Sequence, residues 1–221
     1  VFEQRTVAAL AEVAVFDDIT DRKKAEEALR TAYESLGAKA NELQQYTRKI
    51  KLLGEMGHML QACLTVDEAY TVISQAAQQL FAGEQGALCV LSESQAVVEP
   101  VSTWGQSQVT QVFGPDECWA LRRGRTHSVP DTRDGLICKH LTRPLPGAYI
   151  CVQLMAQGKT LGILHLSQPE PTRLNQAKQQ LVVTMAEHAA LALSNLRHYE
   201  TLRNQSNRDP LTNLFNRRCM E

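Results

Sequence analysis

The stretch "AYICVQLMAQGKTLGILHLSQ", residues 148–168, decides the fold class of this chain. It consists of two β-rich runs on either side of a short segment that contains Gly158 and Lys159. Such a pattern is typical of two antiparallel strands joined by a tight turn. We therefore predict a β-hairpin that turns at Gly158 and Lys159.

The segments before the hairpin extend this reading. "GALCVLSES" (86–94) and "QAVVEPVSTW" (95–104) are further β-rich runs. "TVDEAYTVISQAAQQLF" (65–81) predicts a helix that begins with a capping box of Thr65 and Glu68. "GPDECWALRRG" (114–124) predicts a short helix with Asp116 near its start and Gly124 just after its end. The expected fold class is α+β, an antiparallel sheet flanked by helices.

Long helices are expected on both sides of this sheet. After a predicted strand in "EVAVFDDIT" (12–20), apolar residues recur every seven positions at Leu29, Leu36, Leu43 and Ile50, which indicates a coiled-coil seam. A second seam occurs in a helix expected from near Pro171 to about Asn207. Its residues are Met185, Ala189, Ala192, Leu196 and Tyr199.

The overall composition does not indicate a binding partner. The net charge of the 221 residues is −1, so no overall field attracts nucleic acid or an anionic membrane. We find neither an apolar run of about eighteen residues nor a signal peptide, and we expect a cytoplasmic fragment without membrane contact. Because the chain begins with Val1 and ends in a helical pattern at Glu221, we expect a piece of a longer protein, which would include any membrane attachment.

Both ends resemble parts of known signalling domains. "VFDDITDRKKAEEALR" (15–30) resembles the last strand and exit of a PAS sensory domain. "RDPLTNLFNRRCME" (208–221) resembles the opening helix of a GGDEF diguanylate cyclase. The positions that match that family are Asp209, Leu211, Thr212, Leu214, Asn216 and Arg217. The resemblance implies that Asn216 helps to hold the guanine of GTP. The Gly-Gly-Asp/Glu-Glu-Phe loop is absent from the sequence, so we expect no enzyme activity from this fragment and a diguanylate cyclase only in the full-length protein.

The middle of the chain, over roughly 48–200, resembles a GAF domain. The pattern is that of "ICVQLMAQGKTLGILHL" (150–166), in which Gln153 replaces the proline usual in the family. The predicted organisation is the end of a PAS domain (1–20), a signalling linker helix (21–54), a GAF domain (55–185), a signalling helix (186–207) and the start of a GGDEF domain (208–221).

This organisation predicts a sensory module that controls synthesis of cyclic di-GMP. The resemblance and the two seams imply a parallel homodimer whose helices relay a change in the GAF domain to the cyclase. The effector would be a small molecule of unknown identity. The alternative is a dimerisation spacer that senses nothing.

Four residues in "CWALRRGRTH" (118–127) and "LICKHL" (136–141) predict a metal site. Cys118, His127, Cys138 and His140 are the Cys₂His₂ combination that tetrahedral Zn²⁺ accepts, with the other four cysteines excluded. Four protein ligands would make the site structural. Ordinary burial of the four side chains stays open as the alternative.

Two other readings of this region concern Cys138. "CKH" resembles the Cys-His of bilin-binding GAF domains with one residue inserted, which would make Cys138 the point of a bilin or redox-type ligand sensor. Only 5% of the residues are aromatic, which does not favour a bilin. Free-methionine-sulfoxide reductases are GAF-like enzymes with several reactive cysteines, but nothing beyond the thiols supports that class.

A ligand pocket is a further hypothesis. Trp104 and Trp119 would line it, and Arg122 and Arg123 would face an anionic ligand. The alternatives are core packing for the tryptophans and solvation for the arginines.

Overall fold

The computed structural model describes residues 2–171 and 175–207, with side chains for 22–171 and 175–203. In chain order the elements are α1 (Phe2–Ala62), α2 (Val66–Leu80), β1 (Gln85–Leu91), β2 (Val98–Trp104), η1 (Pro115–Glu117), α3 (Trp119–Arg123), β3 (His127–Val129), β4 (Ala148–Ala156), β5 (Lys159–Gln168) and α4 (Gln176–Asn207). The chain divides into two compact units, Val1–Ile50 and Lys51–Glu221, which are described separately.

The described strands form one antiparallel sheet in the order β2-β1-β5-β4-β3. The predicted hairpin is confirmed as β4 and β5, but its turn comes one residue earlier than expected. Ala156 pairs with Lys159, and the two turn residues are Gln157 and Gly158, with φ of 52° and 75°. A two-residue turn with positive φ at both positions matches the twist of the flanking strands.

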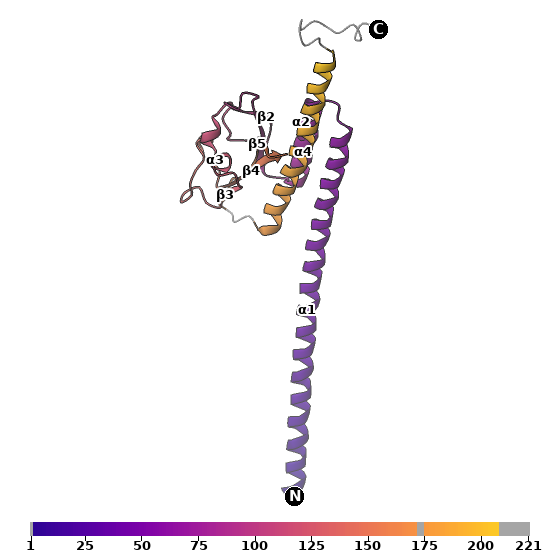
Figure 1. Cartoon of the computed structure of the whole chain (residues 1–221). Helices are drawn as coiled ribbons and strands as arrows, with labels where there is room; N and C mark the ends of the chain where they lie inside the picture. The colour runs from indigo at the N-terminus through magenta and orange to yellow at the C-terminus, as the bar shows by residue number, and fades with distance from the viewer. Residues whose placement is uncertain (1, 172–174, 208–221) are drawn as a thin grey trace. The chain divides into compact units, whose positions relative to one another are not determined.

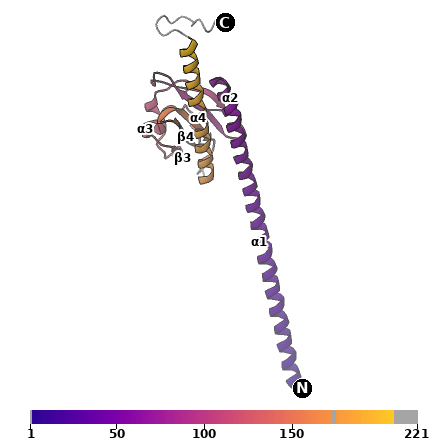
Figure 2. The ribbon, with the colours of Figure 1, turned by 45° about the vertical axis from the view of Figure 1, so that its right-hand side comes forward.

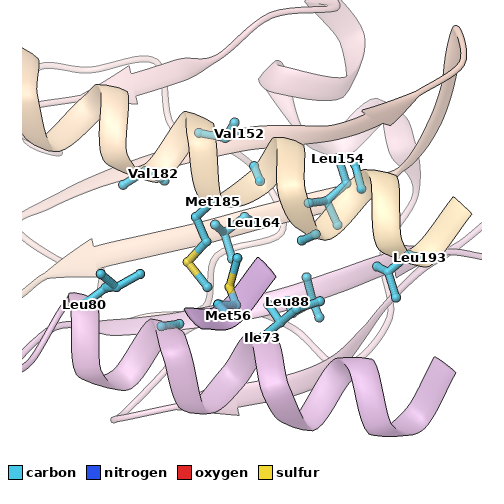
Figure 3. Packing of buried hydrophobic residues seen from close by; sticks show 14 of the residues in the cluster. Met56, Ile73, Leu80, Leu88, Val152, Leu154, Leu164, Val182, Met185 and Leu193 are labelled. Carbon is cyan, nitrogen blue, oxygen red and sulfur yellow. The ribbon is translucent and has the colours of Figure 1, made fainter. Parts of the chain in front are cut away.

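Helices cover one face of the sheet. The end of α1 from residue 51 onward, α2 and α4 pack on that face, and Figure 3 shows their side chains meeting those of the strands. The residues labelled there are Met56, Ile73, Leu80, Leu88, Val152, Leu154, Leu164, Val182, Met185 and Leu193. We call this cluster the helix-side core.

The Thr65 half of the predicted capping box is confirmed, but the Glu68 carboxylate binds the residue before the N-cap instead of the N-cap itself. Thr65 Oγ1 accepts the backbone N–H of Glu68 at 3.3 Å, and the Glu68 carboxylate accepts the N–H of Leu64 at 2.8 Å. One N–H group that the helix itself leaves without a partner, that of Glu68, is thereby satisfied. The segment at Thr65 therefore fixes where α2 begins.

The opposite face of the sheet is covered by η1, α3 and the loops around them. Figures 1 and 2 both show α3 on the side of the strands away from α4. Gly124 ends α3 with φ of 65°, as expected for the residue after a helix. We call the buried residues here the loop-side core. They include Cys89, Phe113, Cys118, Ala120, Cys138, Tyr149 and Cys151.

The strand expected over residues 12–20 is wrong, because α1 is continuous from Phe2 to Ala62. Alanines and other strong helix formers around the β-branched residues of "VAALAEVAVFDDIT" (7–20) favour the helix. In the first unit Leu29, Leu36 and Leu43 are exposed, so the seven-residue seam faces solvent in the single chain.

The last helix, α4, begins at Gln176 rather than near Pro171 and is described as far as Asn207. The Asn175 side chain accepts the N–H of Lys178 at 2.8 Å and acts as its cap. The GGDEF-like segment, with Asn216, lies outside the described residues. Within the described part of the chain, every helix is too short or too polar to cross a membrane.

Candidate functional site

Three cysteines and one histidine converge in the loop-side core. They are Cys118, Cys138, His140 and Cys151, which we call the Cys₃His cluster. Their sulfur and nitrogen atoms all lie within 4.8 Å of one another. All four residues are at most 1% exposed. The groups therefore face one another and the protein rather than water.

Three separate segments bring these side chains together. Cys118 stands at the start of α3, and Cys138 and His140 belong to the loop between β3 and β4. This loop is fixed to the first segment because the N–H of Lys139 donates to the carbonyl of Glu117 at 2.9 Å. Cys151 enters from the middle of β4, so the sheet supplies the fourth group.

Cys151 faces a histidine on each side. Its Sγ lies 3.8 Å from His140 Nε2 and 3.4 Å from His165 Nδ1. His165 is the cross-strand neighbour of Cys151 on β5, and both are completely buried. The Cys151 sulfur and His165 Nδ1 are therefore within hydrogen-bond distance of each other.

Cys138 is held in a setting that favours its thiolate. The backbone N–H of Trp119 donates to Cys138 Sγ at 3.3 Å. Hydrogen bonding from the Cys118 and Cys151 thiols lowers the pKa of Cys138 well below the usual thiol value. The same hydrogen bond with Cys138 raises the pKa of Cys118, and burial raises the pKa of Cys151. These shifts favour ionisation at Cys138 over ionisation at Cys118 or Cys151.

Both histidines near the cluster favour their neutral form. Burial lowers the pKa of His140, and it lowers the pKa of His165 to about 3. His140 is also stacked on Phe113, with ring centroids 4.5 Å apart. A neutral imidazole keeps a nitrogen lone pair, which is what a metal ion requires.

The structure differs from the predicted metal set at one position. His127 lies outside the cluster, where its Nε2 is 2.8 Å from the carbonyl oxygen of Leu136. Cys151, which the sequence reading excluded, takes its place. His127 pairs with Cys151 across β3 and β4. Its ring is directed to the loop carbonyl rather than to the thiols.

Strand alternation is the signal that could have identified Cys151. Ile150, Val152 and Leu154 face the helix-side core, so Tyr149 and Cys151 must face the other side, toward the loops. Of the remaining cysteines, Cys63 and Cys89 stay outside the cluster, and Cys219 lies outside the described residues.

The four residues predicted to line a ligand pocket do not share one site. Trp104 is buried in the helix-side core, whereas Trp119 packs on the loop-side core, on the other face of the sheet. The guanidinium of Arg122 lies 4.3 Å from the centre of the Trp119 ring, and Arg123 is exposed. The alternative of core packing therefore holds for Trp104.

Comparisons with known proteins support the fold. The family model described as GAF domain matches residues 65–193. A comparison with curated protein sequences finds no match.

Solved structures give the same result. The GAF domain of an Acinetobacter phosphoenolpyruvate-protein phosphotransferase superposes with a TM-score of 0.60 at 11% identity, covering 68% of this chain and 95% of that one. Free methionine-R-sulfoxide reductase from Neisseria meningitidis gives 0.60 at 12% identity, with coverages of 70% and 93%. A domain of a putative two-component sensor histidine kinase from Sinorhizobium meliloti gives 0.51 at 16%, with coverages of 62% and 95%.

These identities are low enough that the structural matches show the fold alone. The sheet order, the helices on one of its faces and the family match over residues 65–193 agree with one another. The chain therefore belongs to the GAF domain family.

Proposed function

We propose that this GAF domain is the sensory module of a diguanylate cyclase and that α4 carries its state to the cyclase domain. The observation that supports this is the position of β4. Ile150, Val152 and Leu154 on this strand pack in the helix-side core with α4, while Cys151 on its other face belongs to the Cys₃His cluster. One strand thus separates the cluster from the helix that leads toward the GGDEF-like segment.

The packing of α4 makes the relay physically reasonable. Leu181, Val182, Met185 and Ala189 are at most 4% exposed and fill the core with strand residues. Close-packed interfaces shift between discrete arrangements rather than deform continuously, so a rearrangement of β4 would change the seating of α4. The cyclase motif itself is supported by the sequence at 208–221.

The same proposal includes a parallel homodimer. In the second unit, Leu191, Tyr199 and Leu202 leave more than half of their surface exposed along α4. In the first unit, the exposed seven-residue seam of α1 is a coiled-coil surface without a partner in the single chain. A second copy of the chain would cover each of these surfaces.

Two alternatives make different demands on the domain. A dimerisation spacer would bind no effector, whereas a sensor binds one with different affinity in its two states. A bilin attached through Cys138 would need an accessible thiol, but Cys138 is 1% exposed and its sulfur accepts a hydrogen bond from Trp119. Burial of that thiol does not favour the bilin reading.

The relay is tested by rotating the part of the chain that follows α4 about the helix axis, in the longer polypeptide that carries the cyclase. Two residues inserted after Arg203 rotate everything downstream by about 200°, whereas a seven-residue insertion preserves the heptad phase. We expect the first insertion to change the rate of cyclic di-GMP formation from GTP at least about tenfold, and the second to preserve it. Equal rates in the two proteins, or no turnover of GTP by the parent protein, would contradict the proposal.

A further inference from the structure

The Cys₃His cluster nearly has the dimensions of a zinc site. Tetrahedral Zn²⁺ with Zn–S bonds of about 2.3 Å and Zn–N bonds of about 2.0 Å requires ligand atoms separated by about 3.5–3.8 Å. The separation between Cys151 Sγ and His140 Nε2 is 3.8 Å, and no pair in the cluster exceeds 4.8 Å. Movements of about 1 Å or less per ligand atom would bring all four to bonding distance of one point.

The cluster also has the chemistry of a closed structural site. Three thiols and one imidazole form the Cys₃His set that Zn²⁺ accepts without an open position for water. The N–H of Trp119 already donates to Cys138 Sγ, and His165 Nδ1 lies 3.4 Å from Cys151 Sγ. Hydrogen bonds from such outer groups stabilise thiolate ligands and fix their orientation.

The surroundings of His140 provide an independent observation. The ring is 1% exposed, and Nδ1 has no hydrogen-bond partner among the described residues. Burying an imidazole with no hydrogen bond at Nδ1 and only a sulfur contact at 3.8 Å from Nε2 is costly. A bond from Nε2 to a metal would offset that cost.

We propose that Cys118, Cys138, His140 and Cys151 bind one structural Zn²⁺ ion per chain. The ion would tie the start of α3 and the loop before β4 to the sheet, in addition to the hydrogen bond between Lys139 and Glu117 that already joins the first two segments. This site does not depend on the proposed control of a cyclase, since it requires only the fold of the second unit.

The experiment is metal analysis of the purified chain, expressed with added zinc and kept under a reductant without chelator. We expect one Zn²⁺ per chain in the native mass. We also expect Co²⁺ to replace the zinc and to give the visible bands of a tetrahedral ion together with thiolate charge-transfer absorption. A folded protein that contains no zinc and gives no such Co²⁺ spectrum would overturn the proposal.

Variants distinguish this ligand set from the one expected from sequence alone. Cys151→Ser and His140→Gln should each lower zinc content at least about tenfold at equal free zinc. His127→Gln and Cys89→Ser should keep one Zn²⁺ per chain, because neither side chain belongs to the cluster. Loss of zinc in His127→Gln with retention in Cys151→Ser would overturn the assignment. If Cys151→Ser does not fold, the strength of the thiolate band in the wild-type Co²⁺ protein decides, since three thiolates support the assignment and two contradict it.

Discussion

A Cβ atom at Gly162 would lie 2.0 Å from the backbone carbonyl oxygen of Cys89. Gly162 belongs to β5 and Cys89 to β1, two neighbouring strands in the centre of the sheet. The obstacle is backbone rather than a movable side chain, so the two strands would have to separate. The close approach of the two strands thus requires glycine at position 162.

We predict that Gly162→Ala lowers the free energy of unfolding by about 3 kcal/mol or prevents folding, because the added methyl group overpacks the centre of the sheet. Chemical denaturation monitored by circular dichroism measures this. The matched control is Gly54→Ala in α1, where an added Cβ meets nothing within 4 Å. That change should stabilise the helix by about 0.5–1 kcal/mol. A Gly162→Ala protein as stable as the wild type would show that the strands are not so close.

A second prediction concerns the ion pair between Glu84 and Lys178, which joins the segment before β1 to the first turn of α4. The two side chains are 12% and 21% exposed. Removing one partner leaves the other charge partly buried, so Glu84→Gln should cost about 1–3 kcal/mol of unfolding free energy. Replacing both residues, with Glu84→Gln and Lys178→Met, should recover part of that loss. A double-mutant cycle with zero coupling energy would rule the interaction out as a stabilising contact.

The cap of α2 provides a third prediction. Thr65→Ala removes the side-chain acceptor of the Glu68 N–H and should lower the free energy of unfolding by about 1 kcal/mol. Thr65→Ser keeps the hydroxyl and should lie within about 0.5 kcal/mol of the wild type. Thermal unfolding of the two proteins compares them directly. A Thr65→Ser protein that loses as much stability as Thr65→Ala would indicate that the methyl group matters, not the hydrogen bond.

Local patterns were sufficient to predict most of the GAF domain. The hairpin, the helix cap at Thr65 and the helix end at Gly124 each depend on residues close together in the sequence. Residues 12–20 were assigned wrongly because β-branched residues there suggested a strand, while the helix formers around them favour a continuous α1.

The site could be predicted only in part because it depends on contacts between distant segments. Cys118, Cys138 and His140 were identified from their types and spacing, and the structure brings them together. Cys151 was omitted and His127 was included because residues that are close in the sequence were grouped together. The register of the strands, which brings distant residues together, was not used. The pairing of β3 with β4 puts His127 and Cys151 side by side, but the His127 ring contacts the carbonyl of Leu136 while Cys151 belongs to the cluster.

The proposed homodimer gives a fourth prediction. Leu36 and Leu43 are each 65% exposed in the single chain, so Leu36→Glu with Leu43→Glu should leave the unfolding temperature of the GAF domain unchanged. Like charges facing each other across a parallel seam should weaken association at least about tenfold. Sedimentation equilibrium of the wild type and the double variant measures this. The exposed Lys39→Glu serves as a control for added negative charge. A wild-type chain that stays monomeric at high concentration would contradict the dimer.

A fifth prediction follows from removing the metal. If Zn²⁺ ties the loops to the sheet, a chelator under reducing conditions should loosen residues 118–141 while leaving α2 intact, because α2 packs in the helix-side core on the other face. A ligand at one hundred times its Kd stabilises the native state by about 2.7 kcal/mol, which is about a hundredfold in the opening equilibrium. Amides of residues 118–141 that exchange through local opening should therefore exchange about a hundredfold faster without zinc. Hydrogen exchange with and without the chelator measures both segments in one protein.

The His127→Gln variant should respond as the wild type does, whereas His140→Gln should exchange rapidly already before chelation and change little after it. Equal acceleration in α2 would mean that the ion supports the whole domain, and no acceleration in residues 118–141 would mean that it holds no loop in place.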